Sequence, residues 1–244
     1  AFLKKINAIQ FLGSAFDMKI NSSIETKNFF VANDGMHSLL KKYEQRLKIY
    51  FNQKAIKIDE EKKLVYFESG NKESFDIIIS SLPLPQAKEV FESKINHDAT
   101  FNPCISVGMT ISGSPNYKHV AYKNINEDIS WLGTSKFYNK KNDETWVLQF
   151  SPDASLAMMS DTDSFIQTLA EDAVRNTING QYKIMHSGIF KWKYALCSRS
   201  NLNNEYTYIS KDAFAIGDWN LSPRVESAYI SGNELGKYLT KNIL

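Results

Sequence analysis

Strand-like patterns fill the middle of the chain. Residues 104–111, 129–138, 145–151 and 183–195 run apolar or alternate with polar positions, and they are rich in β-branched and aromatic side chains, which favour strands. Residues 160–163 can cap a helix, and the apolar positions that follow keep the helical period: Phe165, Ile166, Leu169, Ala173, Val174 and Ile178. This order predicts an antiparallel sheet with a helix on one face.

The preceding part of the chain mixes helix and strand signals. Asn33 or Asp34 can cap a helix over residues 36–47. Its apolar positions have helical spacing: Met36, Leu39, Leu40, Tyr43 and Leu47. Residues 49–51 and 55–58 have the composition of two short strands. Residues 75–85 hold an apolar run that ends in a proline turn, which predicts a buried parallel strand.

The end of the chain combines a short strand, an acidic turn and a helix within residues 214–232. Pro223 can occupy the first helical turn, where its missing N–H is harmless. The helix carries Ala228, Gly232 and Gly236 at i, i+4 and i+8, and each interior glycine costs about 1 kcal/mol relative to alanine. This face of small residues predicts a close approach to a sheet or to a ligand.

Asp218 lies in the turn between that strand and that helix. A carboxylate at a strand end, beside a helix N-terminus with free N–H groups, is a common way to hold the polar parts of a flavin. The alternative is an ordinary strand-to-helix joint at the end of an α/β domain.

Four segments, in their order and spacing, resemble the flavin-dependent amine oxidase superfamily, especially its renalase-like branch. Residues 214–232 resemble the C-terminal FAD-binding motif of that branch, GDW…PRVEGA…SG. Residues 30–36, 75–86 and 191–195 resemble its YVAPGGM, FDAVVLALPAPQ and WRYA segments. The resemblance covers roughly residues 28 to 242, and no one of these motifs is diagnostic by itself.

The resemblance implies a set of FAD-binding residues: Ala55, Leu82, Pro83, Trp192, Gly217, Asp218, Trp219, Arg224 and Val225. In the family pattern, Asp218 would hydrogen-bond the ribityl chain, the backbone near Val225 would meet the pyrimidine edge of the flavin, and Ala55 would lie near the adenine. Arg224 could neutralise reduced flavin or pair with a carboxylate such as Glu226. No residue stands out as a general base, so the catalytic residues stay unassigned.

The family begins with a strand, a G-x-G-x-x-G turn and a helix that binds the FAD pyrophosphate. No such turn occurs among the 11 glycines of this sequence, so about a hundred residues of nucleotide-binding fold would be missing. Three explanations stay open: a truncated chain, a second polypeptide that completes the fold, or a degenerate relative without FAD. A lost central strand would expose a parallel sheet edge, which predicts association with a partner polypeptide or with another copy.

The predicted fold class is therefore α/β, or α+β overall. An incomplete FAD-binding Rossmann-like domain, residues 28–85 and 209–244, would hold an inserted antiparallel sheet domain for the substrate, residues 86–208. Residues 1–27 would add a further piece to the substrate domain.

Composition and other motifs narrow the function classes. A net charge of +2 on 244 residues implies neither nucleic-acid binding nor attraction to a membrane surface. For the two cysteines, Cys104 and Cys197, we expect buried free thiols, which fit a cytoplasmic location, and the alternative is a disulfide between them. The four histidines lack metal-ligand spacing, and neither H-E-x-x-H nor G-x-S-x-G occurs, so we predict no metal site.

The leading hypothesis is an FAD-dependent oxidoreductase that oxidises an amine or a reduced nicotinamide by hydride transfer to the flavin. Such an enzyme would act on a small-molecule substrate whose identity the sequence does not reveal. The alternative is a non-catalytic, cofactor-free binding or subunit protein that retains the fold.

Overall fold

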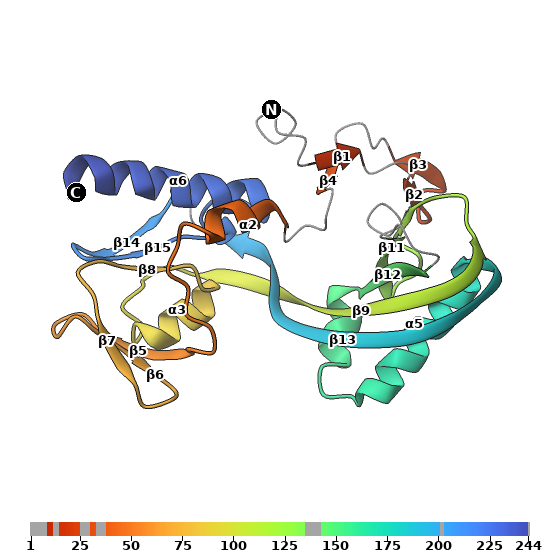
Figure 1. The fold of residues 1–244 in the computed structure, drawn as a ribbon, viewed down its shortest axis with the longest axis horizontal. Coiled ribbons are helices and arrows are strands. Elements are labelled where there is room, and N and C mark those ends of the chain that lie inside the picture. The colour runs from red at the N-terminus through yellow and green to blue at the C-terminus, as the bar shows by residue number, and fades with distance from the viewer. Residues whose placement is uncertain are drawn as a thin grey trace. The chain divides into compact units, whose positions relative to one another are not determined.

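The computed structural model describes residues 9–11, 15–24, 30–32, 38–134, 143–200 and 203–243. The chain forms two compact units, the first from residues 1–49 and 103–193 and the second from residues 50–102 and 194–244. Two long strands, β9 (Ala99–Asn116) and β13 (Asn179–Ser200), contribute to both units (Figure 1). These bounds differ from those of the domains predicted from the sequence, whose assignment to cofactor and substrate stays a prediction.

The first unit is built on a seven-stranded sheet in the order β13-β9-β12-β11-β10-β2-β3. Its shorter strands are β2 (Ala15–Asp17), β3 (Ser22–Ile24), β10 (Ala121–Lys123), β11 (Ile129–Thr134) and β12 (Asp143–Phe150). Strands β9, β12, β11 and β10 pair antiparallel in turn, whereas β10 and β2 are parallel. A separate antiparallel pair is formed by β1 (Ile9–Phe11) and β4 (Phe30–Ala32).

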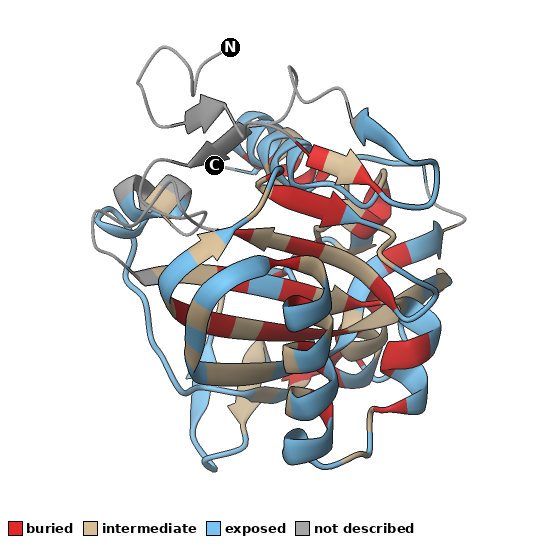
Figure 2. Cartoon of the chain, turned by 90° about the vertical axis from the view of Figure 1, so that its right-hand side faces the viewer, coloured by how far each residue is buried: buried red, intermediate tan, exposed pale blue. Residues whose placement is uncertain are grey.

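Helix α5 (Asp163–Thr177) supplies one side of the first unit's core. Thr162 caps it, because its hydroxyl accepts a hydrogen bond from the Phe165 amide at 3.4 Å. Ile166, Ala170 and Val174 are fully buried with apolar residues of the sheet, and Figure 2 shows buried positions along the strands and exposed ones on the outer faces of the helices. The predicted sheet and helix are thus confirmed. Helix α4 (Pro152–Ala157), which Ser151 caps, was not predicted.

The second unit contains two three-stranded sheets. Strands β5 (Ala55–Asp59), β6 (Leu64–Phe67) and β7 (Lys72–Ser74) form an antiparallel meander. The other sheet has the order β14 (Thr207–Ser210), β15 (Ala213–Ala215) and β8 (Ile78–Ser80), in which β15 and β8 are parallel. The predicted parallel strand is therefore present, but it lies at an edge of the sheet among the described residues, and Ile79 is exposed, so the predicted burial is wrong for that position.

Two helices cover this parallel pair from opposite faces, as in a doubly wound α/β fold. Phe214 of β15 packs against Leu235 and Leu239 of α6 (Val225–Asn242). The neighbouring Ala213 and Ala215 belong instead to the core of helix α3 (Leu84–Val90). The chain thus combines an α/β layer structure with a mostly antiparallel sheet, in agreement with the predicted fold class.

Three local predictions need correction. Residues 49–51 form no strand, and Tyr50 and Phe51 are exposed. Helix α2 spans Ser38–Glu44, shorter than the predicted 36–47, and Met36 lies outside the described residues. Pro223 precedes the cap residue of α6, Arg224, so it lies outside the first helical turn.

Both cysteines are free thiols, as predicted, with Cys197 buried and Cys104 partly exposed.

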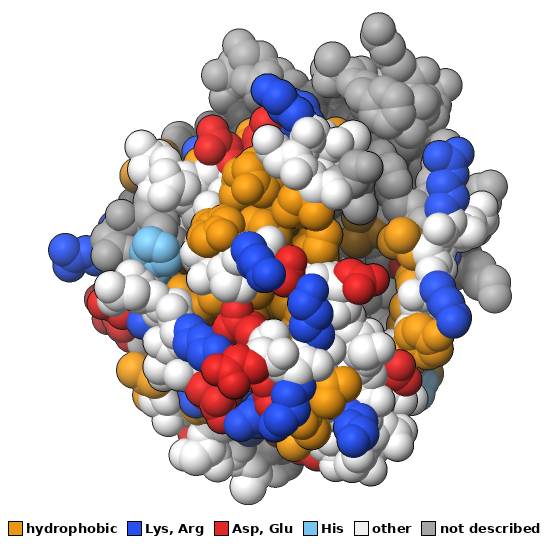
Figure 3. Space-filling view, turned by 90° about the vertical axis from the view of Figure 1, so that its left-hand side faces the viewer, with side chains coloured by type: hydrophobic (Ala, Val, Ile, Leu, Met, Phe, Trp, Pro, Cys, Tyr) orange, Lys and Arg blue, Asp and Glu red, His pale blue; other side chains and the backbone are white. Residues whose placement is uncertain are grey.

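Hydrophobic side chains gather among charged ones on the face shown in Figure 3. Within the described residues, every helix is too short or too polar to cross a membrane.

Candidate functional site

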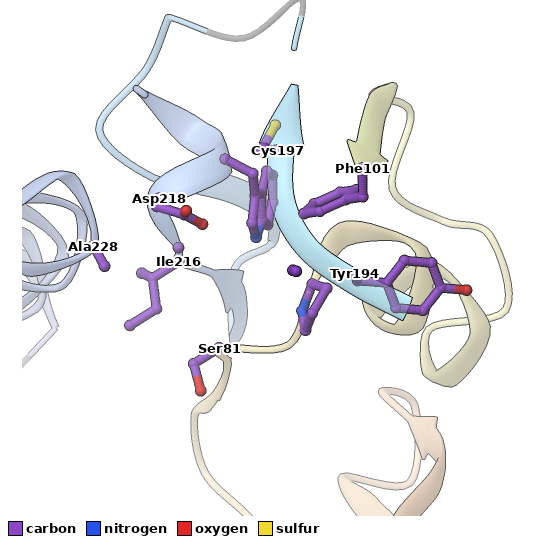
Figure 4. A pocket seen from close by; sticks show the side chains of 11 residues that line it. Ser81, Phe101, Tyr194, Cys197, Ile216, Asp218 and Ala228 are labelled. Atoms are coloured by element: carbon purple, nitrogen blue, oxygen red, sulfur yellow. The ribbon is translucent and has the colours of Figure 1, made fainter. Parts of the chain in front are cut away.

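A pocket of about 210 Å³ lies in the second unit, where the end of β8, the turn after β15 and helix α6 come together. Its lining residues are Ser81, Pro83, Phe101, Tyr194, Ala195, Cys197, Ile216, Gly217, Asp218, Trp219 and Ala228. Figure 4 shows Ala228 on one side of the pocket and Phe101 with Tyr194 on the other, with Ile216 and Asp218 between them. The pocket therefore collects side chains from strand ends that are distant in sequence.

The turn after β15 is held by hydrogen bonds on both of its sides. The Gly217 amide donates to the Ser231 hydroxyl at 3.1 Å, which joins the turn to α6. The Trp219 indole donates to the Leu82 carbonyl at 3.2 Å, which joins it to the end of β8. A Cβ atom at Gly217 would lie 2.4 Å from the Trp219 indole nitrogen, so this contact requires glycine. These contacts join the wall of the pocket to both α6 and β8.

Among the residues that the structure describes, Asp218 is the one carboxylate that lines this pocket. It begins a short 3₁₀ helix, Asp218–Asn220, and it is partly buried. Burial raises the pKa of its carboxyl group above the ordinary value of 3.8, while hydrogen bonds from the Trp219 amide and from its own amide oppose that rise. No lysine or arginine pairs with it within the described part of the chain. A carboxylate has about four acceptor sites, so beyond these backbone hydrogen bonds it can still accept from a ligand.

Cys197 faces the same pocket but is poorly suited to act as a nucleophile. Burial raises the pKa of its thiol, and the negative charge of Asp218 raises it further. A thiol with a raised pKa stays protonated near neutral pH, and the thiolate is the reactive form. Its sulfur lies 3.6 Å from the Arg199 carbonyl oxygen. The geometry thus assigns Cys197 to the wall of the pocket.

Helix α6 presents a different face to the sheet than the sequence pattern predicted. Its buried residues are Ser227, Ser231, Leu235 and Leu239. On the small-residue face, Ala228 lines the pocket, Gly232 would place a Cβ at an ordinary 3.6 Å from Ile216, and Gly236 has no neighbour within 4 Å among the described residues. The predicted close approach to a sheet is therefore wrong, and the face beside the pocket is open.

The structure brings four of the predicted FAD-binding residues to the pocket: Pro83, Gly217, Asp218 and Trp219. Leu82 adjoins them through its hydrogen bond to Trp219. Ala55 lies on β5 and does not line the pocket, and Arg224 and Val225 lie at the start of α6, where Val225 is exposed. Their roles toward a flavin stay predictions.

Trp192 lies on the part of β13 that belongs to the first unit. Its side chain is 56% exposed and stacks on Phe190, with ring centroids 6.3 Å apart. It does not line the pocket of the second unit, and its place beside a flavin likewise stays a prediction.

Sequence reasoning missed Phe101 and Cys197 as pocket residues. Phe101 reaches the pocket because β9 and β13 are neighbours in the sheet, and its ring meets Tyr194 edge-on at a centroid distance of 5.9 Å. That pairing joins residues far apart in the chain, so no local pattern indicates it. The segment 191–195 did carry a signal, since Tyr194 and Ala195 belong to the family-like motif and both line the pocket.

The chain belongs to the family of flavin-containing amine oxidoreductases, because the family model matches residues 5–191. The match ends before the pocket residues of β13, of the turn after β15 and of α6. A search of curated proteins finds no match.

Solved structures share the fold at low identity. A protein assigned as a protoporphyrinogen oxidase from Exiguobacterium sp. 255-15 is 11% identical, with a TM-score of 0.66 over 90% of this chain and 54% of its own. Reduced UDP-galactopyranose mutase is 12% identical, with a TM-score of 0.60 over 88% and 53%. A redesigned putrescine oxidase is 9% identical, with a TM-score of 0.57 over 87% and 54%. The chain thus spans about half the length of the structures that it matches.

Proposed function

We propose that this chain forms the flavin-holding part of a renalase-like FAD-dependent oxidoreductase, which oxidises an amine or a reduced nicotinamide. The observation that carries the proposal is the Asp218 carboxylate, which faces a pocket without a cation partner among the described residues, in a chain of a flavin-containing family. Because the chain spans about half the length of the matched structures, the activity and the substrate of a whole enzyme are part of this proposal.

The residues at the pocket fit one portion of a flavin. Asp218 offers acceptor oxygens to hydroxyl groups, and Phe101 and Trp219 provide an apolar wall. Arg224 gives α6 no side-chain cap, and the Ser227 amide already donates to the Arg224 carbonyl, so among the described residues the Val225 and Glu226 amides are the ones left to an electronegative group. A pocket of about 210 Å³ is smaller than the roughly 300–1,000 Å³ of a typical ligand site. It would therefore hold only part of FAD.

FAD, when bound, would supply the acceptor for a hydride from the substrate. Asp218 would accept a hydrogen bond from a ribityl hydroxyl and so orient the ligand. The start of α6 would place partial positive charge where negative charge develops. Ser231 would act through Gly217, since its hydroxyl fixes the position of that amide.

We propose in addition that a strand from another polypeptide, one that carries the nucleotide-binding segment, pairs with β8. The Ile78 amide donates to the Asp212 carbonyl, and the Ser80 carbonyl accepts from the Ile216 amide, both at 2.8 Å toward β15. Backbone groups alternate in direction along a strand, so the N–H and C=O of Ile79 face the other edge. No strand pairs there among the described residues, and Ile79 is 43% exposed.

Riboflavin is the sharpest probe of the Asp218 site, because it contains the ring and the ribityl chain but no nucleotide. Titration of the chain should quench riboflavin fluorescence, and Asp218→Ala should weaken the binding at least tenfold. Glu73→Ala, which removes an exposed carboxylate from β7, is the matched control. Equal binding by the Asp218 variant would contradict the assigned role, and no binding of riboflavin or FAD by any variant would favour the cofactor-free alternative.

Sedimentation velocity with intact-mass analysis tests the edge of β8. We expect the chain to associate with a second polypeptide, and Ile79→Lys to abolish that association by placing a charge on the edge strand. Ile56→Lys, at a position 50% exposed on β5, should have no effect. Assembly of copies of this chain alone would support the alternative of self-association.

A further inference from the structure

A second, larger groove lies in the first unit, alongside helix α5. Its volume is about 500 Å³. Its floor is apolar and buried, formed by Ile129, Phe150 and Met158, which belong to the core of the sheet. Neither the family match nor the flavin proposal assigns any role to this groove.

Helix α5 has apolar side chains that are not buried in the core of its unit. Ile166 and Ala170 are fully buried against the sheet, whereas Phe165 and Leu169 are 49% and 37% exposed and line the groove. Phe165 and Leu169 are four residues apart, so they lie one above the other on the same face. Asn176 extends this face, and the wall is therefore about 16 Å long at 1.5 Å per residue.

The groove is acidic around its apolar floor. Asp128, Asp161 and Asp172 line it, and none of the three forms an ion pair within the described residues. The nearby Lys191 and Arg175 form their ion pairs with other carboxylates. Lys191 donates to the Asp161 carbonyl at 2.6 Å and pairs with Asp163 at 3.3 Å, and Arg175 pairs with Glu171. An occupant that brings positive charge would therefore meet three unneutralised carboxylates.

We propose that this groove docks an amphipathic α-helix of a partner protein, whose apolar stripe covers Phe165 and Leu169 and whose flanking lysines or arginines meet the three aspartates. A straight wall of about three helical turns suits a second helix, which packs 8–10 Å away through such ridges. The proposal is independent of flavin binding.

A labelled helical peptide of leucine and lysine, with leucines at i, i+3, i+4 and i+7, is the probe. Fluorescence anisotropy with the full chain should detect its binding, and Leu169→Gln or the pair Asp128→Asn with Asp172→Asn should each weaken it at least tenfold. The matched controls are Leu156→Gln, at an exposed position of α4 outside the groove, and the pair Glu61→Gln with Glu73→Gln. Circular dichroism verifies that each variant is folded.

Equal weakening by the control variants, or no binding of the peptide, would overturn the proposal. So would equal binding of a peptide in which glutamate replaces every lysine, since the three aspartates would repel it. Binding of a small amine such as benzylamine without any peptide binding would identify a ligand site instead and would also overturn the docking role. The proposal is supported if peptide binding weakens in Leu169→Gln and in the pair Asp128→Asn with Asp172→Asn, and in neither control.

Discussion

The indole nitrogen of Trp219 donates a hydrogen bond to the carbonyl oxygen of Leu82, 3.2 Å away and 137 positions earlier in the chain. This bond joins the turn after β15 to the end of the parallel strand β8. Trp219 is only 2% exposed and belongs to the core that surrounds α3. The same side chain therefore stabilises the second unit and forms a wall of the candidate flavin pocket.

Trp219→Phe should lower the free energy of unfolding by about 1–3 kcal/mol. It removes the donor to the Leu82 carbonyl and leaves unfilled volume in the core. Trp192→Phe is the matched control, because Trp192 is 56% exposed and its replacement should change stability by less than about 0.5 kcal/mol. Urea denaturation followed by far-UV circular dichroism compares the two. Equal losses in the two variants would contradict the structural role of Trp219.

Gly217→Ala should destabilise the second unit, by about 1–3 kcal/mol as for other overpacked sites. The new Cβ would lie 2.4 Å from the Trp219 indole nitrogen, and that buried ring has little room to move. Gly236→Ala is the opposite case, because it adds a methyl group to an open helix position, which should stabilise α6 by about 0.5–1 kcal/mol. Thermal denaturation should separate the two variants in sign, and a shift of the same sign would refute this reading.

Thr207→Val tests a buried polar pair near the same turn. The Thr207 hydroxyl donates to the Asn220 side-chain oxygen at 2.8 Å, and both residues are buried. The Asn220 amide nitrogen already lacks a partner within the described residues. Loss of the hydroxyl would leave the whole amide unpaired, at a cost of about 1–3 kcal/mol. Thr168→Val, on the exposed side of α5, should change the unfolding midpoint little, and a comparable loss there would argue against the pair.

Local patterns in the sequence predicted most of the elements that surround the pocket of the second unit and the groove of the first unit. The alternation in β9 and the period of α5 were readable because each element places its apolar residues against one core. Helix α4 was missed, although Ser151 followed by Pro152 is a recognisable helix start. The prediction of a strand at residues 49–51 was wrong, because three apolar residues form a strand only where another strand pairs with them.

The face of α6 shows what periodicity leaves undetermined. Helical spacing correctly groups Ala228 with Gly232, but it does not say which face meets the sheet. Hydrogen bonds decided it: the Ser231 hydroxyl accepts from the Gly217 amide, and the Ser227 hydroxyl lies 2.7 Å from that of Ser222. The buried side of α6 thus combines these two serines with Leu235 and Leu239, which pack against Phe214. Likewise, Phe101 lines the pocket only because β9 pairs with β13, a strand distant in sequence, and no single segment indicates that pairing.

Asp218→Asn should raise the stability of the chain at neutral pH while it weakens flavin binding. The folded state raises the pKa of Asp218 above 3.8, chiefly through burial. The folded chain therefore holds this proton more tightly than the unfolded chain. Between the two pKa values the unfolded state binds fewer protons, so the free energy of unfolding falls as pH rises through that window. Asparagine carries no charge and removes this contribution.

Urea denaturation of both proteins at pH 4 and pH 7 measures the effect. The advantage of Asp218→Asn over the natural chain should be larger at pH 7, where the buried carboxylate is charged. Asp76→Asn, at an exposed position before β8, is the control for the substitution itself. A carboxylate that costs stability at neutral pH and is nevertheless placed in a pocket is typical of a functional residue. An equal advantage at both pH values would show that burial does not disfavour the charge, and this argument for a ligand at Asp218 would be lost.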